Sequence, residues 1–215
     1  MRCYDPRVRL PGFFTSLFKS AVWRFNENDR IVYLTFDDGP IPEVTPWVLE
    51  LLEKEEIKAT FFCVGENVQK YPEVYRQIIE NGHSVGNHTF SHFQGLKKDD
   101  QDFFRNIELA GKYIDSDLFR PPHGWLKVSQ YNYLKKKFRI IMWDLISCDY
   151  DRRISPESVL KNVTGFVRPG SIITFHDSVK AENNLRKALP LSIRWMKEQG
   201  YRFEAIPYKQ KNKAE

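Results

Sequence analysis

The chain has 215 residues, of which 41% are hydrophobic, so it is long enough for one sizeable core, and no stretch has the composition of a linker. Its 33 basic and 28 acidic residues leave a net charge of +5, and a lysine-rich run at residues 209–213 contributes much of the excess. No stripe of alternating basic and aromatic residues accompanies this charge, which indicates a solvated tail and excludes the usual nucleic-acid binding pattern. We expect one domain and no nucleic-acid partner, while affinity for an anionic glycan stays open.

The first thirty residues form a separate segment. Phe14, Leu17, Phe18, Ala21 and Phe25 recur at helical spacing, which predicts an amphipathic extension. We expect it to pack against the main domain, with a membrane surface or a partner as the alternative. Its apolar stretch is short and broken, and it lacks a small-residue cleavage site, so it predicts neither a signal peptide nor a transmembrane span. We therefore expect a cytoplasmic protein, or one associated with the cell envelope if its substrate lies there.

Apolar runs alternate with helical patterns along the rest of the chain. The predicted strands cover residues 31–36, 59–64, 84–87, 118–120, 139–143, 171–175 and 201–206. Thr45-Pro46 and Ser155-Pro156 each predict a capping side chain before a helix that begins with proline. Strands alternating with helices indicate a parallel sheet. The expected organisation is an extension at residues 1–30, a catalytic domain at 31–207 and a basic tail at 208–215.

Cysteine plays no evident chemical part. Cys3, Cys63 and Cys148 are odd in number and lack a C-x-x-C spacing, which argues against a disulfide framework. Cys63 lies in an apolar run and is expected to be a buried small hydrophobe.

Two polar motifs supply the ligands of a metal site. The run T-F-D-D-G-P at residues 35–40 contributes Asp37 and Asp38, and H-T-F-S-H at residues 88–92 contributes His88 and His92. If the second motif is helical, both imidazoles leave from one face and can bind one ion. Three protein ligands leave an open position at which a water can be acidified, and a fourth group must then act as base. One of the two carboxylates fits each task, so the sequence predicts a metal-dependent hydrolase.

These motifs resemble those of the polysaccharide deacetylases of the NodB-homology type, carbohydrate esterase family 4, over residues 31–206. The resemblance implies a distorted, incomplete (β/α) barrel of about seven parallel strands. It also implies that Asp37 is the catalytic base and that Asp38, His88 and His92 hold the metal. Zinc is the expected ion, and nickel or cobalt suit similar ligands.

Three further family motifs have counterparts in this chain. Residues 120–123 read R-P-P-H, which implies that Arg120 lies beside the base and that the backbone N–H following Pro122, at His123, helps to hold the oxyanion. Asp149 matches the aspartate that pairs with the catalytic histidine, and His176 matches the general acid. Thr174 stands where the family usually has an aliphatic residue lining the acetyl-methyl pocket. The polar residues of all five motifs fall at or just beyond the ends of predicted strands, which is the face where barrel active sites form.

The implied reaction is removal of acetyl groups from an acetylated glycan such as peptidoglycan or chitin, with acetate released. Asp37 would take a proton from water, and His176, kept charged by Asp149, would protonate the leaving amine. Two alternative substrates stay open: an O-acetyl ester of a xylan-type glycan, and a non-sugar amide such as a cyclic ureide or imide. His123 and Thr174, which depart from the family pattern, leave room for the non-sugar amide. A noncatalytic glycan-binding barrel is a third reading, but it has no need for the full set of site residues.

Overall fold

The structure is a computed structural model that describes residues 8–9, 12–26, 28–97 and 99–211. Its centre is a single sheet of parallel strands in the order β5-β4-β3-β2-β1-β7-β6, with β8 paired to β1. The strands are β1 (Ile31–Asp37), β2 (Thr60–Cys63), β3 (Ser84–Asn87), β4 (Leu118–Phe119), β5 (Arg139–Ile140), β6 (Leu145–Ile146), β7 (Ile172–His176) and β8 (Arg202–Phe203). The strand order begins at β5 and ends at β6, and over the described residues these two strands form no ladder with each other. The sheet therefore does not close, and this is the predicted incomplete barrel.

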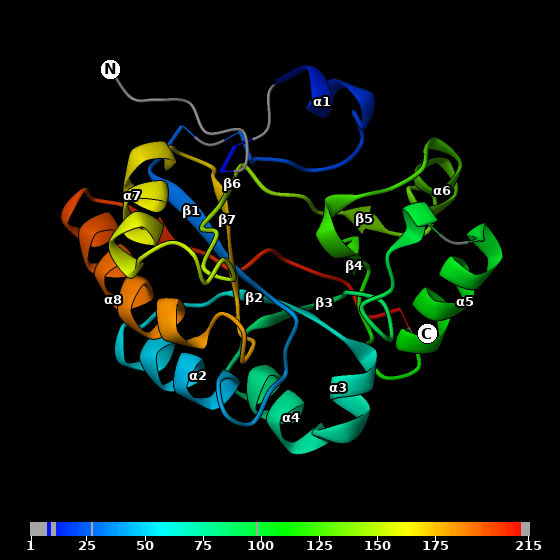
Figure 1. The fold of residues 1–215 in the computed structure, drawn as a ribbon, viewed down its shortest axis with the longest axis horizontal. Helices are drawn as coiled ribbons and strands as arrows, with labels where there is room; N and C mark the ends of the chain where they lie inside the picture. The colour runs from blue at the N-terminus through cyan, green and yellow to red at the C-terminus, as the bar shows by residue number, and fades with distance from the viewer. Residues whose placement is uncertain (1–7, 10–11, 27, 98, 212–215) are drawn as a thin grey trace.

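Helices surround this sheet, with α7, α8 and α2 on one side of the view in Figure 1 and α5 and α6 on the other. The α-helices are α1 (Gly12–Leu17), α2 (Thr45–Lys54), α3 (Gly65–Lys70), α4 (Pro72–Glu80), α5 (Asp100–Ala110), α6 (Val128–Leu134), α7 (Pro156–Phe166) and α8 (Glu182–Glu198). Two 3-10 turns, η1 (Gly95–Lys97) and η2 (Pro122–Gly124), complete the elements. In the part of the chain that the structure describes, none of the helices is long and apolar enough to cross a membrane.

The longest strands carry continuous apolar runs because helices cover one face and the barrel interior the other. All seven residues of β1 are buried. The rings of Phe36 in β1, Phe61 in β2 and Phe175 in β7 form the centre of the core, with ring centroids 5.0 Å apart for Phe36 and Phe61 and 6.3 Å apart for Phe36 and Phe175. Cys63 is buried in the same cluster, as expected. This packing fixes the relative positions of the strand ends that carry the polar motifs.

Two local expectations are corrected and a third is confirmed. Residues 139–143 are not one strand: β5 ends at Ile140, and a separate strand β6 follows at Leu145–Ile146. Thr45 does not cap α2, because it is itself the first helical residue and its hydroxyl donates a hydrogen bond to Asp177 at 2.6 Å. The prediction for Ser155 is confirmed, since its hydroxyl oxygen accepts a hydrogen bond from the N–H of Ser158.

The N-terminal extension is helical only over α1, and its later part pairs with the sheet instead. Val22 forms a parallel bridge with Ile141 and Arg24 an antiparallel bridge with Ser171. The backbone of residues 22–24 therefore pairs with residues next to the strands, although the spacing of the apolar residues favours a helix. Phe18, Ala21 and Phe25 contact the buried clusters of the barrel, whereas Leu17 is exposed. The side chain of Phe14 and residues 1–7, 10–11 and 27 lie outside the described part.

The expected C-terminal tail runs along the barrel as far as it is described. The backbone N–H groups of Lys209 and Lys211 donate to the carboxylates of Asp117 and Asp115, at 2.7 and 2.6 Å. Residues 212–215 lie outside the described part of the chain.

Gly170 tests the docking of the extension. Its backbone has φ +79°, and a Cβ there would overlap the carbonyl oxygen of Phe25, whose own N–H donates to the Gly170 carbonyl at 2.9 Å. We expect Gly170→Ala to lower the free energy of unfolding by at least about 2 kcal/mol, measured by urea denaturation, because strain and overlap add.

Gly165 is the matched control, since it lies inside α7 and a Cβ there meets nothing within 4 Å. Gly165→Ala should stabilise the protein by about 0.5–1 kcal/mol through its helix propensity. Equal effects of the two substitutions would contradict the close approach of residues 25 and 170.

Candidate active site

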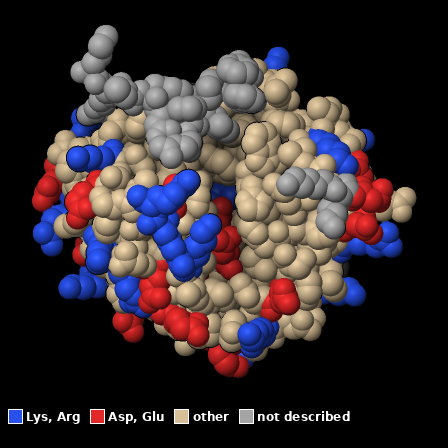
Figure 2. Space-filling model, in the orientation of Figure 1, with Lys and Arg blue, Asp and Glu red and all other residues tan. Residues whose placement is uncertain are grey.

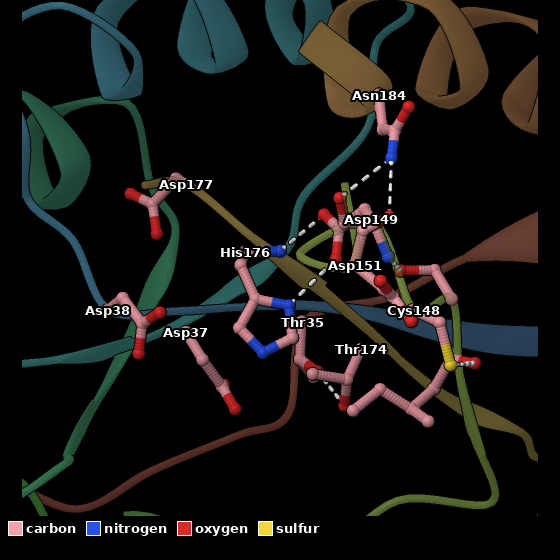
Figure 3. Close-up of polar contacts among 12 residues, drawn as sticks. Thr35, Asp37, Asp38, Cys148, Asp149, Asp151, Thr174, His176, Asp177 and Asn184 are labelled. Carbon is pink, nitrogen blue, oxygen red and sulfur yellow. Dashed lines mark hydrogen bonds and ion pairs between the residues drawn. The ribbon is translucent and has the colours of Figure 1, made fainter. Parts of the chain in front are cut away.

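The carboxyl ends of four strands of the sheet bring the motif residues together. Asp37 and His176 are the last residues of β1 and β7 and face each other in the ladder. His88 directly follows β3, and Arg120 directly follows β4. Figure 3 shows the side chains of Asp37, Asp38 and His176 gathered at these ends. The predicted convergence at one edge of the sheet is therefore what the structure contains.

Asp38, His88 and His92 form a cluster suited to a divalent metal. Their ligand atoms all lie within 4.8 Å of one another, with Asp38 Oδ1 3.2 Å from His92 Nε2 and 3.8 Å from His88 Nε2. His88 Nδ1 lies 2.7 Å from the carbonyl oxygen of Arg120. This contact requires a proton on Nδ1 and so leaves the lone pair of Nε2 for a metal. The donors fit the ion that the sequence predicted.

The electrostatics of the cluster favour its metal-binding protonation state. Burial lowers the pKa of His88 to about 4, so its imidazole is neutral at pH 7. For Asp38, burial acts to raise the pKa, but the hydrogen bond with His92 and the nearby imidazoles outweigh it and hold the pKa well below its ordinary value. An ionised carboxylate beside a neutral imidazole is what metal ligation needs.

The H-T-F-S-H segment is a loop, so the helical condition under which His88 and His92 would share one face is not met, and the loop brings the two rings together instead. Thr89 and His92 have φ of 65° and 52°, in the left-handed region. Two asparagine side chains hold this shape: Oδ1 of Asn87 accepts from the N–H of Thr89, and Oδ1 of Asn106 accepts from those of Phe90 and Ser91, at 2.8, 2.8 and 3.1 Å. Sequence reasoning missed Asn106, because an asparagine on an amphipathic helix carries no signal of its distant partner.

Arg120 holds Asp37 from below the pocket. Its guanidinium is fully buried, donates to Asp37 Oδ1 at 2.6 Å, and also donates to the hydroxyls of Thr35 and Thr174 at 2.8 and 3.2 Å. Burial lowers the pKa of Arg120, and the charge of Asp37 opposes that shift. The Nε and Nη2 of Arg120 donate to the carbonyl oxygens of Ile141 and Met142, at 3.3 and 2.9 Å. Thr174 therefore lies below the pocket, whose apolar wall includes Ile146 instead.

His176 is paired with Asp149. Its Nδ1 lies 2.8 Å from Asp149 Oδ1, and its backbone N–H donates to Asp149 Oδ2 at 2.8 Å. Burial disfavours the charged ring, but the charge and hydrogen bond of Asp149 outweigh it and raise the pKa of His176 to about 9. His176 is therefore an imidazolium near neutral pH and can give up a proton.

Asp177, directly after His176, holds the turn that follows Asp38. Its carboxylate accepts hydrogen bonds from the N–H of Gly39, at 3.1 Å, and from the hydroxyl of Thr45. Burial raises the pKa of Asp177 to about 8. The hydrogen bond between Gly39 and Asp177 joins the turn after Asp38 to the turn after His176. It thereby fixes the position of Asp38 relative to His176.

These groups open into a cavity of about 540 Å³. It is lined by Asp37, Asp38, His88, His92, His123, Trp125, Trp143, Ile146, Tyr150, His176 and Lys180. His123 has φ 59°, and its ring lies edge-on to that of His92 at 4.8 Å, while Pro122 before it is buried. Trp125 is 51% exposed. The rings of Tyr150 and His176 are nearly perpendicular, with their centroids 4.9 Å apart. The pocket is therefore polar at its base and aromatic along its walls.

Comparison with known proteins agrees with this arrangement. The sequence profile of the family described as polysaccharide deacetylase matches residues 25–137. A peptidoglycan-N-acetylglucosamine deacetylase of Bacillus cereus is 31% identical over 193 residues, which cover 86% of this chain and 91% of that protein. This chain belongs to the polysaccharide deacetylase family.

Two solved structures with the same fold differ in activity: one is a deacetylase and the other is described as a pseudoenzyme. The crystal structure of the Bc1960 peptidoglycan N-acetylglucosamine deacetylase has a TM-score of 0.83 at 30% identity, over 92% of this chain and 95% of that one. The structure of BA3943, described as a CE4 family pseudoenzyme from Bacillus anthracis, has a TM-score of 0.76 at 25% identity, over 86% and 67% of the two chains. Deacetylases and a pseudoenzyme share this barrel, so activity depends on which residues occupy the site and not on the fold alone.

Asp149 offers a direct test of the electrostatics. Asp149→Asn removes the charge that raises the pKa of His176 and leaves the burial that lowers it. We expect the pKa of His176 in metal-free protein, followed by nuclear magnetic resonance, to fall from about 9 toward the ordinary 6.5. A raised folded-state pKa stabilises the folded chain below pH 6.5 and loses this effect as the pH rises through 9. Over that range the unchanged protein should lose up to about 3 kcal/mol more stability than Asp149→Asn.

Asp151→Asn is the control, because Asp151 lies in the same loop but its carboxylate pairs with Arg153 at 2.8 Å. It should leave the pKa of His176 near 9. A pKa that stays there in Asp149→Asn as well would refute the assigned cause.

Proposed function

We propose that this protein is a metal-dependent hydrolase that removes N-acetyl groups from N-acetylglucosamine-containing glycans of the peptidoglycan or chitin type and releases acetate. The observation that carries the proposal is the presence, in one pocket, of three metal-binding side chains, an arginine-held carboxylate and an imidazolium. Relatives named as peptidoglycan-N-acetylglucosamine deacetylases, and a chitooligosaccharide deacetylase of Azorhizobium caulinodans that is 34% identical over 72% of this chain, support the substrate class. Such a substrate would place the enzyme at the cell envelope.

Asp38, His88 and His92 would hold the metal. A bound divalent ion supplies a Lewis acid that polarises the acetyl carbonyl and lets water ionise near neutral pH. Zinc is our proposal from the two imidazoles and one carboxylate, and nickel or cobalt would fit the same donors.

Asp37 is the proposed general base. It lines the pocket beside the metal ligands, while its Oδ1 is fixed by Arg120 at 2.6 Å. The guanidinium holds the carboxylate in a fixed position, from which it can accept a proton from water. The hydroxyl of Thr174 bonds to the guanidinium below the pocket, so we infer that Thr174 positions Arg120 and does not touch the substrate.

His176 is the proposed general acid. Cleavage of an amide expels an amine that leaves poorly unless it is protonated, and the imidazolium maintained by Asp149 can donate that proton. The backbone N–H of His123, after Pro122, is the proposed donor to the oxyanion, and this role does not depend on the His123 side chain.

Acetate release tests the proposal. Enzyme loaded with zinc should release acetate from N-acetylglucosamine oligomers or from peptidoglycan glycans, with mass spectrometry locating the lost acetyl group. Asp37→Asn should lower kcat by a factor of about 100 to 10,000, because the base is lost while the fold and the hydrogen bond to Arg120 can persist. No release from either glycan by enzyme with zinc bound would reject N-deacetylation.

The role of His176 has its own test. An ester leaving group needs less protonation than an amine, so His176→Ala should reduce turnover of an N-acetyl substrate at least tenfold more than turnover of an O-acetyl substrate. Parallel assays of acetate release on acetylated chitosan oligomers and an O-acetylated xylan oligomer measure the ratio. Equal losses on both substrates would contradict the acid role.

A further inference from the structure

The two walls of the catalytic pocket differ in chemistry. One wall carries Trp125, which is half exposed. The other carries Tyr150 and Lys180, where the Lys180 ammonium lies over the Tyr150 ring, 5.4 Å from its centroid. The centroid of the same ring lies 4.9 Å from that of His176. The Tyr150 ring therefore contacts both Lys180 and the histidine that is proposed to protonate the leaving amine.

Lys180 presents an uncompensated charge at the pocket mouth. Its side chain is exposed, and among the described residues no carboxylate forms an ion pair with it. A side chain in this position can meet substrate without first breaking a salt bridge.

A second hollow continues the positive charge beyond Lys180. It has a volume of about 460 Å³ and is lined by Arg152, Val179, Lys180, Glu182, Asn183, Asn184 and Arg186. Arg152 donates to the Lys180 carbonyl at 3.3 Å and, within the described residues, has no carboxylate partner. Arg186 is neutralised by Glu182 at 2.8 Å, so Lys180 and Arg152 are the free cations. Figure 2 shows basic side chains gathered beside the central hollow of this face.

The carboxylates of the catalytic pocket do not cancel these cations. Asp37 is already paired with the buried guanidinium of Arg120, and the charge of Asp38 would be taken up by the metal ion that it is proposed to bind. The positive charge of the rim is therefore available to a ligand that lies across it.

We propose that Lys180 and Arg152 form a subsite for a carboxylate carried beside the acetylated sugar, so that the enzyme favours an anionic glycan over a neutral one. This inference rests on the proposed deacetylation. In a chitin-type chain every sugar is neutral. In a peptidoglycan-type chain alternate sugars bear a lactyl ether, whose carboxylate is free or is extended by a peptide with carboxylates of its own. A sugar ring seated in the pocket would place its neighbour over the cationic hollow.

Steady-state kinetics with zinc-loaded enzyme test the subsite on three glycans of equal length. These are a neutral N-acetylglucosamine oligomer, a glycan with free lactyl carboxylates, and one that bears stem peptides. Lys180→Gln should raise KM for a carboxylate-bearing glycan about fivefold, the range of an exposed ion pair, and should raise KM for the neutral oligomer by less. Arg152→Gln should add a loss of similar size, and Lys180→Arg should restore most of the affinity.

Lys187→Gln is the matched control, because Lys187 is an exposed lysine further along α8 that lines neither hollow. It should change none of the three KM values. A loss confined to the lactyl glycan assigns the subsite to that carboxylate, and a loss confined to the stem-peptide glycan assigns it to the peptide. Equal effects of Lys180→Gln on neutral and anionic glycans, or no effect, would overturn the proposal.

Binding separates this proposal from the proposed reaction. Calorimetric titration of metal-free enzyme with the carboxylate-bearing glycans should show the same fivefold weakening in Lys180→Gln, and added salt should reduce the difference. Absence of acetate release with this preference intact would reject the reaction and keep the subsite. Turnover of all three glycans without a charge preference would reject the subsite and keep the reaction.

Discussion

The buried guanidinium of Arg120 is the interaction on which the rest of the site depends. A charge this deep is costly unless every donor is satisfied, and here its N–H groups reach Asp37, two threonine hydroxyls and the carbonyls of Ile141 and Met142. Its own backbone carbonyl accepts the proton of His88 Nδ1. One residue thus holds the proposed base and also sets the tautomer of His88, a proposed metal ligand. Loss of the charge of Arg120 or of Asp37 would leave the other charge buried and uncompensated, at a cost of about 3–5 kcal/mol.

Most of the site could be predicted from sequence because parallel strands end at a common edge. Asp37, His88, Arg120 and His176 each follow an apolar run directly, so a correct strand prediction already brings them together. The strand order was not needed for this step. The apolar core that fixes those ends is also legible, since continuous Val, Ile, Leu and Phe runs are what a doubly covered sheet requires.

The parts that sequence could not supply depend on partners far along the chain. The loop between His88 and His92 is held by Asn106, and the turn that follows β1 and carries Asp38 is held by Asp177; neither residue carries a local signature of this role. The hydroxyl of Thr45 likewise bonds to Asp177, which lies far along the chain, instead of capping α2. The two-residue strand β6 is too short to produce a periodic pattern, and it exists because β7 offers a ladder. In each case a tertiary hydrogen bond decides between local conformations of similar energy.

The pairing of the N-terminal extension has a consequence for where the catalytic unit begins. The family profile starts at residue 25, yet the N–H of Val22 donates to the carbonyl of Ile140, and its carbonyl accepts from the N–H of Met142. A chain shortened to the profile boundary would strip this pairing and leave unpaired backbone groups just beyond β5, next to the carbonyls that hold Arg120. Bare strand edges recruit other strands. The extension thus covers backbone groups beside β5 and supports the segment whose carbonyls hold Arg120.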